Sequence, residues 1–160
     1  MTLPDLVLAP MVGLSELPFR ILCRSDGANV CYTPMWHSRR FAVDDEYRKI
    51  AMASSVEDRP SVIQFAANTP EDFVNAGLLA QQNFDAIDLN LGCPQRDARE
   101  AHFGCYLIER EDWPVVTAIV RAASKSLKIP VYCKIRLCRK LEDTLEFVKL
   151  LEKAGCKLLT

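Results

Sequence analysis

The sequence predicts an α/β protein built on a parallel β-sheet, and three observations support that prediction. Short apolar runs alternate along the chain with stretches that have helical periodicity. The apolar runs are nearly continuous, which is typical of strands covered on both faces. The segments between successive runs are long enough for the right-handed crossovers that parallel strands require.

The predicted elements follow one another in a regular order. Strands are expected at residues 6–9, 30–33, 61–66, 86–91, 131–136 and 157–160. Helices are expected at residues 15–25, 69–82, 113–127 and 142–154. The segment 35–57 lacks a clear period, so we expect a long loop there with a short helix around residues 44–52.

Capping residues support three of these helices. Thr69, followed by Pro70 and two acidic residues, is typical of a helix N-terminus. Ser15 is expected to cap the first helix, and Gly155 is expected to end the last one. The helices therefore have defined ends between the strands, as βαβ units need.

The length of 160 residues allows one compact domain. A complete (β/α)8 barrel takes about 250 residues, so these six strands could only form its N-terminal part. An open doubly wound sheet is the other architecture that fits this order of elements. The sequence contains neither G-x-G-x-x-G nor a G-x-x-x-x-G-K loop, which weakens a nucleotide-binding doubly wound sheet.

Composition excludes several classes of protein. Hydrophobic residues make up 49% and the formal net charge is -1, values that exclude a disordered chain. No charge-free run approaches the roughly 18 apolar residues of a membrane span, and the N-terminus lacks the features of a secretory signal. We therefore expect a cytoplasmic protein, with the nucleus as the alternative, and no membrane partner.

The seven cysteines do not predict a metal site. No pair has C-x-x-C spacing and the chain has only two histidines, so zinc binding of familiar spacing is not expected. Buried, reduced thiols are expected for every cysteine except Cys93. Cys93 differs because it lies between Gly92 and Pro94, on a turn directly after a predicted strand.

Polar residues gather where the predicted strands end. Gln64 lies in the third strand, Asn90 and Cys93 at the end of the fourth, and Lys134 in the fifth. Parallel α/β folds build their sites at this edge, so we expect these side chains to converge there. Lys134 is hard to explain otherwise, because a charged amine is rarely buried in an apolar strand without a partner. Gln64 could instead be an ordinary polar residue with its own partners.

Seven basic residues follow the second, fourth and fifth predicted strands. They are Arg39, Arg40, Arg96, Arg99, Arg136, Arg139 and Lys140. This placement predicts a basic rim around the site, where a phosphate backbone would approach, although the net charge is not that of a nucleic-acid binder. Asp97 and Glu100 offset part of the charge, and a solvated charged surface is the simpler alternative.

Several stretches together resemble the tRNA-dihydrouridine synthase family. They are LAPMVGLSELPFR at 8–20, CYTPM at 31–35, DRPSVIQFAANTPE at 58–71, AIDLNLGCPQ at 86–95 and CKIR at 133–136. DLNLGCPQ is nearly diagnostic, and the resemblance covers essentially the whole chain. CYTPM, EDRP and LEKAGCKLLT are most similar to eukaryotic members that act on adjacent D-loop uridines, the 16/17 type.

The resemblance implies an FMN-dependent (β/α)8 barrel that uses NADPH to reduce the C5–C6 double bond of uridine in the tRNA D-loop. Pro10, Met11 and Val12 match the backbone segment that lies against the isoalloxazine ring. Gln64 matches the residue that hydrogen-bonds the pyrimidine edge of the ring, and Lys134 matches the cation near its N1 and O2 atoms. FMN, NADPH and tRNA are thus the expected cofactor, reductant and partner.

The resemblance also implies which residues contact the substrate. Asn90 would contact both the flavin and the uracil, and Arg136 would lie near the substrate. Cys93 would protonate uracil C5, which a thiol that stays protonated at neutral pH can do. The basic rim adds Arg96 and Arg99 as expected tRNA contacts.

The sequence departs from the family in two places. The family pattern G-x-Y-G-A reads A-H-F-G-C at residues 101–105, so Cys105 replaces a smaller alanine. The chain also ends after KLLT, where a His-Gly-Arg motif, two further strands and a helical domain would follow in the family. We therefore expect residues 1–160 to be the N-terminal part of a barrel domain, with exposed first and sixth strands.

Such an incomplete barrel is expected to bind FMN poorly or not at all. The reason is that the loops after the last two strands commonly build the phosphate site in these barrels. The flavin absorbance of the purified, soluble chain checks this expectation. Flavin that co-purifies in stoichiometric amount would contradict it.

Other functions stay open on the sequence alone. One is another FMN barrel enzyme acting on a free pyrimidine, such as a dihydroorotate or dihydropyrimidine dehydrogenase, although the basic rim favours tRNA. A second is a truncated, catalytically inactive product that at most binds partners. A thiol hydrolase using Cys93 and His102 is the weakest, since no glycine-rich oxyanion loop or orienting carboxylate is evident. The sequence does not predict the oligomeric state.

Overall fold

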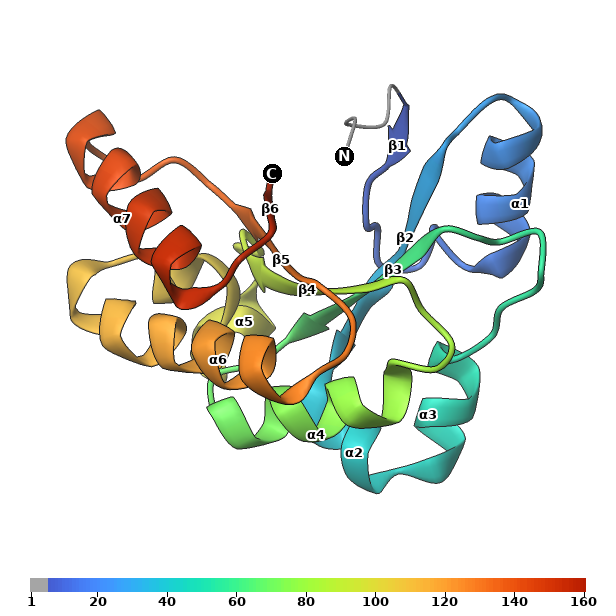
Figure 1. The fold of residues 1–160 in the computed structure, drawn as a ribbon, viewed down its shortest axis with the longest axis horizontal. Helices are drawn as coiled ribbons and strands as arrows, with labels where there is room; N and C mark the ends of the chain where they lie inside the picture. Colours follow the sequence, from blue (N-terminus) through green and yellow to red (C-terminus); the bar gives the residue numbers. More distant parts are fainter. Residues whose placement is uncertain (1–5) are drawn as a thin grey trace.

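The computed structural model describes residues 6–160, and its strands form one parallel sheet in the order β1-β2-β3-β4-β5-β6. The strands are β1 (Val7–Leu8), β2 (Val30–His37), β3 (Ser61–Ala66), β4 (Ala86–Leu91), β5 (Val131–Ile135) and β6 (Leu158–Leu159). A doubly wound sheet would reverse its strand order at a switch point, and this sheet does not. The sheet curves instead into an open half-barrel (Figure 1), which confirms the predicted incomplete (β/α)8 architecture.

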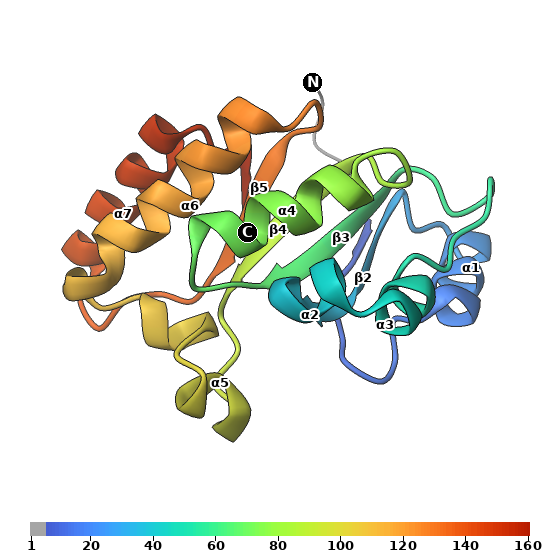
Figure 2. The same cartoon turned by 90° about the horizontal axis from the view of Figure 1, so that it is seen from below.

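Helices connect the strands and the longest ones lie on the convex face of the sheet. They are α1 (Leu17–Ser25), α2 (Ser38–Val43), α3 (Asp45–Ala51), α4 (Pro70–Ala80), α5 (Arg96–Glu100), α6 (Trp113–Ser126) and α7 (Leu141–Ala154). Two short 3-10 turns, η1 (Gly104–Leu107) and η2 (Arg110–Asp112), follow α5. Figure 2 shows α4 and α6 side by side across the sheet, with α5 projecting from the end where β4 finishes.

The helix ends test the predicted caps. Thr69 accepts a hydrogen bond from the Asp72 N–H at 3.2 Å, and Gly155 ends α7 in the left-handed region at φ +114°, as expected. Ser15 was the wrong cap, because α1 begins after Glu16. The Ser15 hydroxyl instead accepts from the Met11 N–H at 2.9 Å and donates to the Met11 carbonyl at 3.1 Å. Ser15 therefore stabilises the loop after β1 and does not cap the helix.

The segment 35–57 is more regular than the sequence predicted. Strand β2 continues through Met35 to His37, and helices α2 and α3 follow it directly. The sequence predicts a strand only at 30–33, and Pro34, which cannot donate to the ladder, lies inside the observed one. The structure accommodates Pro34 with a register shift between Tyr32 and Met35, after which pairing with β3 resumes at Gln64. The elements α5, η1 and η2 were also missed.

The main core lies between the convex face of the sheet and the helices. Side chains such as Phe65, Ile87 and Leu89 from the strands pack there with Ile119 of α6 and Leu151 of α7. The concave face has a smaller apolar cluster, in which Tyr32, Val62 and Ala86 are buried. Because side chains alternate along a strand, the residues two positions further on, towards the strand ends, share that concave face. These residues include Gln64 and Asp88, so the concave face becomes polar near the C-terminal ends of the strands.

A buried ion pair ties α1 to the loop before β3. Arg20 and Asp58 are 2% and 0% exposed, so neither charge is solvated. Arg20 donates to Asp58 Oδ2 from Nε at 2.9 Å and from Nη2 at 2.6 Å. Nη1 donates to the Ser15 carbonyl at 2.9 Å, and Nη2 also donates to the Ala53 carbonyl at 2.8 Å. Four of the five guanidinium N–H groups therefore have acceptors within the protein, which offsets the cost of burying the charge.

The prediction that the cysteines other than Cys93 are buried is only partly right. Cys31 and Cys133 are buried, and both belong to strands. Four others are half-buried, namely Cys23, Cys105, Cys138 and Cys156. They lie in helices or connecting segments, where one side faces solvent. All seven thiols are free.

Candidate active site

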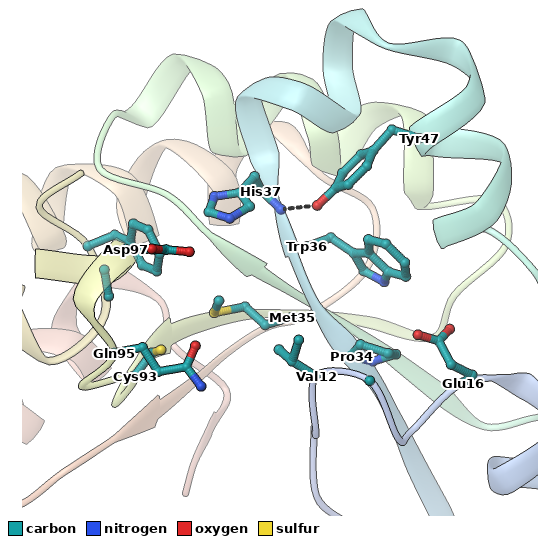
Figure 3. A pocket seen from close by; sticks show the side chains of 13 residues that line it. Val12, Glu16, Pro34, Met35, Trp36, His37, Tyr47, Cys93, Gln95 and Asp97 are labelled. Atoms are coloured by element: carbon teal, nitrogen blue, oxygen red, sulfur yellow. Dashed lines mark hydrogen bonds between the residues drawn. The ribbon is translucent and has the colours of Figure 1, made fainter. Parts of the chain in front are cut away.

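A cavity of about 260 Å³ opens at the C-terminal end of β2 (Figure 3). The loop after β1 contributes Val12, the end of β2 contributes Met35 and Trp36, and the loop after β4 contributes Cys93. The cavity thus lies at the edge where parallel sheets place their sites. Val12 and Cys93 are the predicted site residues that line it.

Aromatic residues form one wall of the cavity, and the sequence analysis missed them. Trp36 meets Tyr47 edge to face at 5.1 Å between ring centroids, and His37 meets Phe103 in the same way at 5.2 Å. The Tyr47 hydroxyl accepts from the His37 N–H at 2.9 Å, as Figure 3 shows. The available signal was the aromatic pair Trp36-His37, which follows the predicted strand 30–33 after two residues and lies inside the observed β2.

Three side chains on the concave face form a continuous chain of hydrogen bonds, which we call the amide relay: Asp88, Gln64 and Asn90. Gln64 Nε2 donates to Asp88 Oδ2, and Asn90 Nδ2 donates to Gln64 Oε1, both at 2.8 Å. Asn90 Oδ1 in turn accepts from the backbone N–H groups of Gly92 at 3.1 Å and Cys93 at 2.9 Å. The relay therefore connects the buried sheet to the turn that carries the thiol.

Other contacts hold the Cys93 turn from its outer side. The Cys93 carbonyl accepts from the Cys105 N–H at 3.1 Å, and the Gly92 carbonyl accepts from Arg136 Nε at 2.5 Å. Gly104 lies so close that a Cβ there would be 2.6 Å from the Cys93 carbonyl oxygen, and its φ is +65°. Only glycine suits both conditions. The loop that replaces the usual alanine with Cys105 thus still packs against Cys93.

Lys134 lies beside Asn90 in the register of β4 and β5, and it is half-buried. Among residues 6–160 its ammonium makes no hydrogen bond or ion pair within the protein. Its charge acts on Asp88, where it lowers the pKa of the carboxyl. Lys134 and Asn90 therefore present an ammonium and an amide on the concave face, as predicted. Pro10 and Met11 lie in the loop after β1, at the other side of the sheet from β5.

Burial raises the pKa of Asp88 to about 7, against the smaller lowering effects of the Gln64 hydrogen bond and the Lys134 charge. Asp88 Oδ1 is buried with no hydrogen-bond partner. Three other titratable groups interact with this carboxyl: Tyr32 of β2, Cys133 of β5 and Cys156 before β6. Burial raises the pKa of Tyr32, and the contact between the two thiols raises the pKa of Cys133 and lowers that of Cys156, while the Asp88 charge is a smaller upward effect on each.

Because the pKa of Asp88 is raised, the stability of the protein should depend on pH. Asp88→Asn should remove this dependence. The carboxyl contributes fully to the free energy of unfolding below its unfolded pKa of about 3.9. That contribution is lost as the pH rises through about 7, the pKa in the folded protein. The variant keeps an acceptor for Gln64, so its advantage over the parent should grow between pH 4 and pH 8. At about 1.4 kcal/mol per pKa unit, the full difference is on the order of 4 kcal/mol. Urea unfolding of both proteins at several pH values checks this, and a constant difference would contradict it.

All seven residues of the basic rim are exposed. They lie after β2 in α2, after β4 in α5 and after β5, so each follows the C-terminal end of a strand. Arg40 stacks on the Tyr47 ring at 4.3 Å from its centroid, and Arg96 pairs with Glu100 at 2.7 Å. Arg99 lies on the same helix, α5, as Arg96.

Within residues 6–160, no cluster of three or more His, Cys, Asp or Glu side chains has the geometry to hold a metal ion. In the same part of the chain, none of the helices combines the length and apolar character that crossing a membrane requires.

Comparison with known families gives one match that spans the described chain. The sequence model of the family described as Dihydrouridine synthase (Dus) matches residues 7–160. Among solved structures, a truncated form of 3-deoxy-D-arabino-heptulosonate 7-phosphate synthase from Thermotoga maritima aligns with a TM-score of 0.51. It is 14% identical, and the alignment covers 99% of this chain and 53% of that one, which supports the barrel fold alone.

Curated relatives are similar over nearly the whole chain. A mouse protein named tRNA-dihydrouridine(16/17) synthase NAD(P)(+)-like is 49% identical over 156 residues, covering 96% of this chain and 32% of the mouse protein. The tRNA-dihydrouridine(16/17) synthase of Schizosaccharomyces pombe is 42% identical, covering 98% of this chain and 39% of the yeast protein. The Saccharomyces cerevisiae protein of that name is also 42% identical, with 37% of its length covered. The chain thus spans about a third of these relatives.

Proposed function

The chain belongs to the dihydrouridine synthase family, and from that premise we propose that it contributes the proton-donating half of a flavin-dependent tRNA uridine reductase. The observation that carries this proposal is the position of Cys93. The amide relay and Arg136 hold its turn at the mouth of the half-barrel, and Asn90 and Lys134 lie on the adjoining concave face. A thiol, an amide and an ammonium are thereby grouped at one strand edge.

The residues on the concave face fit an FMN ring. The Lys134 ammonium has no acceptor among residues 6–160 and stands where it could neutralise a negatively charged ring edge. Met11 and Val12 lie on the loop opposite, where backbone could face the flat ring. Gln64 fits less directly, because both of its amide atoms already bind Asp88 and Asn90 and it is 1% exposed. Asn90 also uses both amide atoms, but it is half-buried and its Nδ2 keeps a second N–H that no group among residues 6–160 accepts. We therefore assign Gln64 to orienting Asn90, and the ring contact to Lys134 and Asn90.

FMN, when bound and reduced by NADPH, supplies the hydride that uracil C6 accepts. The chain's own task is to supply the proton. Charge builds on uracil C5 and O4, and the Cys93 thiol, which lines the cavity, donates the proton to C5. Water then returns a proton to the thiolate. The aromatic wall of Trp36, Tyr47 and Phe103 excludes water from part of this cavity.

A tRNA substrate is favoured over a free pyrimidine by the basic rim. A small base needs no charged surface around the mouth, whereas a tRNA brings phosphates to it. The target base must also leave its stack to reach a site recessed at a strand edge. The cytoplasmic location predicted from the sequence stays a prediction.

Dihydrouridine formation in uridine-containing tRNA tests the proposal directly. We suggest comparing the 160-residue chain with an extended chain, in which the remaining C-terminal part of the mouse relative follows Thr160. FMN and NADPH are supplied, and dihydrouridine is measured by mass spectrometry of digested tRNA. Product from the extended chain supports the proposal. Reduction of free uracil or orotate, with no product in tRNA, would instead favour a pyrimidine dehydrogenase.

If the basic rim contacts tRNA phosphates, the affinity for tRNA should fall as the salt concentration rises. Arg96→Ala and Arg99→Ala should each weaken tRNA binding and lower the slope of log affinity against log salt by about one. Lys153→Ala, on the far end of α7, serves as the control for a lost surface charge. Filter binding of tRNA at several salt concentrations measures the slopes. Equal slopes for all four proteins would exclude this rim as the tRNA contact.

A further inference from the structure

Asp88 is a buried carboxylic acid that the proposed reaction does not use. It lies in β4 with 0% of its surface exposed, at the inner end of the amide relay. Its Oδ2 accepts from Gln64 Nε2 at 2.8 Å. Oδ2 can accept this bond whether or not Oδ1 carries a proton, and an amide has one donor and one acceptor end. The contact therefore favours the orientation in which Gln64 turns Nε2 to Asp88.

The orientation of Gln64 determines that of Asn90. With Nε2 turned to Asp88, Gln64 presents Oε1 to Asn90 and accepts from its Nδ2 at 2.8 Å. Asn90 must then present Oδ1 to the turn, where the N–H groups of Gly92 and Cys93 donate to it. The buried acceptor at Asp88 and the backbone donors of the turn thus favour the same orientation of both amides.

We propose that Asp88 is a positioning residue for Cys93, acting through Gln64 and Asn90. Without an acceptor at position 88, the Gln64 amide can reverse and turn Nε2 toward Nδ2 of Asn90, donor against donor. Asn90 must then give up its bond to Gln64 or reverse and lose the bonds from the N–H groups of Gly92 and Cys93, and either change loosens the turn. The role of this positioning in proton delivery rests on the proposed function, whereas the positioning itself does not.

The reactivity of the Cys93 thiol tests the positioning without any catalysis. In the purified chain we expect Asp88→Leu to raise the rate of Cys93 alkylation by iodoacetamide about fivefold or more, because a freed turn exposes the thiol. Asp88→Asn keeps an acceptor and should stay within about twofold of the parent. Site-resolved mass spectrometry separates Cys93 from the other thiols, and Cys23 in α1 serves as the internal reference. Amide hydrogen exchange at Gly92 and Cys93 should follow the same order.

Two further variants separate the relay from general destabilisation. Gln64→Met breaks the relay at its centre, so it should reproduce the effect of Asp88→Leu, and combining the two should add little. It also replaces Asp88→Leu if that variant fails to fold. Leu89→Val weakens packing on the opposite face of β4 and leaves the relay intact. It should lower stability with no change at Cys93.

The extended chain adds the catalytic readout. Asp88→Leu should lower kcat about tenfold with little change in KM for tRNA, and Asp88→Asn should restore most of it, because only an acceptor is required. Unchanged Cys93 reactivity and exchange in both Asp88→Leu and Gln64→Met would overturn the proposal whatever the activity. If neither the extended parent nor its variants form dihydrouridine, but Cys93 reactivity still changes in Asp88→Leu and Gln64→Met, the proposed function would be contradicted and the relay supported.

Discussion

Replacing Cys93 by alanine is expected to lower dihydrouridine formation by about 10²- to 10⁴-fold, the range that a general acid contributes. The alanine methyl group cannot donate a proton, so uracil C5 would depend on water. Binding of tRNA should be unchanged, since the turn is held by backbone groups and not by the thiol. The extended chain is the protein to use, with dihydrouridine quantified by mass spectrometry.

A matched thiol variant makes this result specific. Cys23→Ala removes another half-buried thiol, on α1, and should leave activity at the parent level. Cys93→Ser puts a poorer acid of similar size at this position. Its activity should lie between those of the parent and Cys93→Ala, or close to that of Cys93→Ala. If Cys93→Ala retained most of the activity, the proton would have to come from another group and the assignment of Cys93 would be wrong.

Replacing Arg20 by alanine is expected to lower the free energy of unfolding by about 3–5 kcal/mol, because the Asp58 carboxylate would then be left buried with its main partner missing. Domains of this size have only about 5–15 kcal/mol in total, so the loss is a large share. Arg24 reaches Asp58 at 3.5 Å, but it is also engaged with the carbonyls of Asn29 and Pro60. Urea unfolding monitored by circular dichroism measures the loss.

Two comparisons show whether the cost comes from the orphaned charge. The double variant Arg20→Met with Asp58→Leu removes both charges and should be less destabilised than Arg20→Ala alone. Glu100→Ala breaks the exposed pair with Arg96 and should cost no more than about 0.5 kcal/mol. An Arg20→Ala protein as stable as Glu100→Ala would mean that Asp58 is not truly desolvated.

The strands could be predicted from the sequence because each buried run carries its own signal. Apolar runs such as 61–66 and 86–91 have the bounds of β3 and β4. The end of β2 could not be predicted, because Pro34 argues locally against a strand and only pairing with β3 overrides it. The short helices α2 and α5 have too few residues for their periodicity to stand out.

The site shows the same division between local and distant information. Cys93 stood out because a thiol between glycine and proline after a strand is unusual in itself. The role of Asp88 could not be read, since it depends on β3 and β4 lying in a register that sets Gln64 opposite Asp88. Gly104 was missed for a similar reason: its closeness to Cys93 arises from the fold of η1 against the turn.

The order of the strands has a consequence for how the protein is made. Each strand from β2 to β6 pairs with the strand that precedes it in the chain. A nascent chain that leaves the ribosome from its N-terminus can therefore add each strand and helix to a sheet that already exists, without waiting for a distant partner. Assembly can advance vectorially, and each newly docked strand becomes the template for the one still being synthesised.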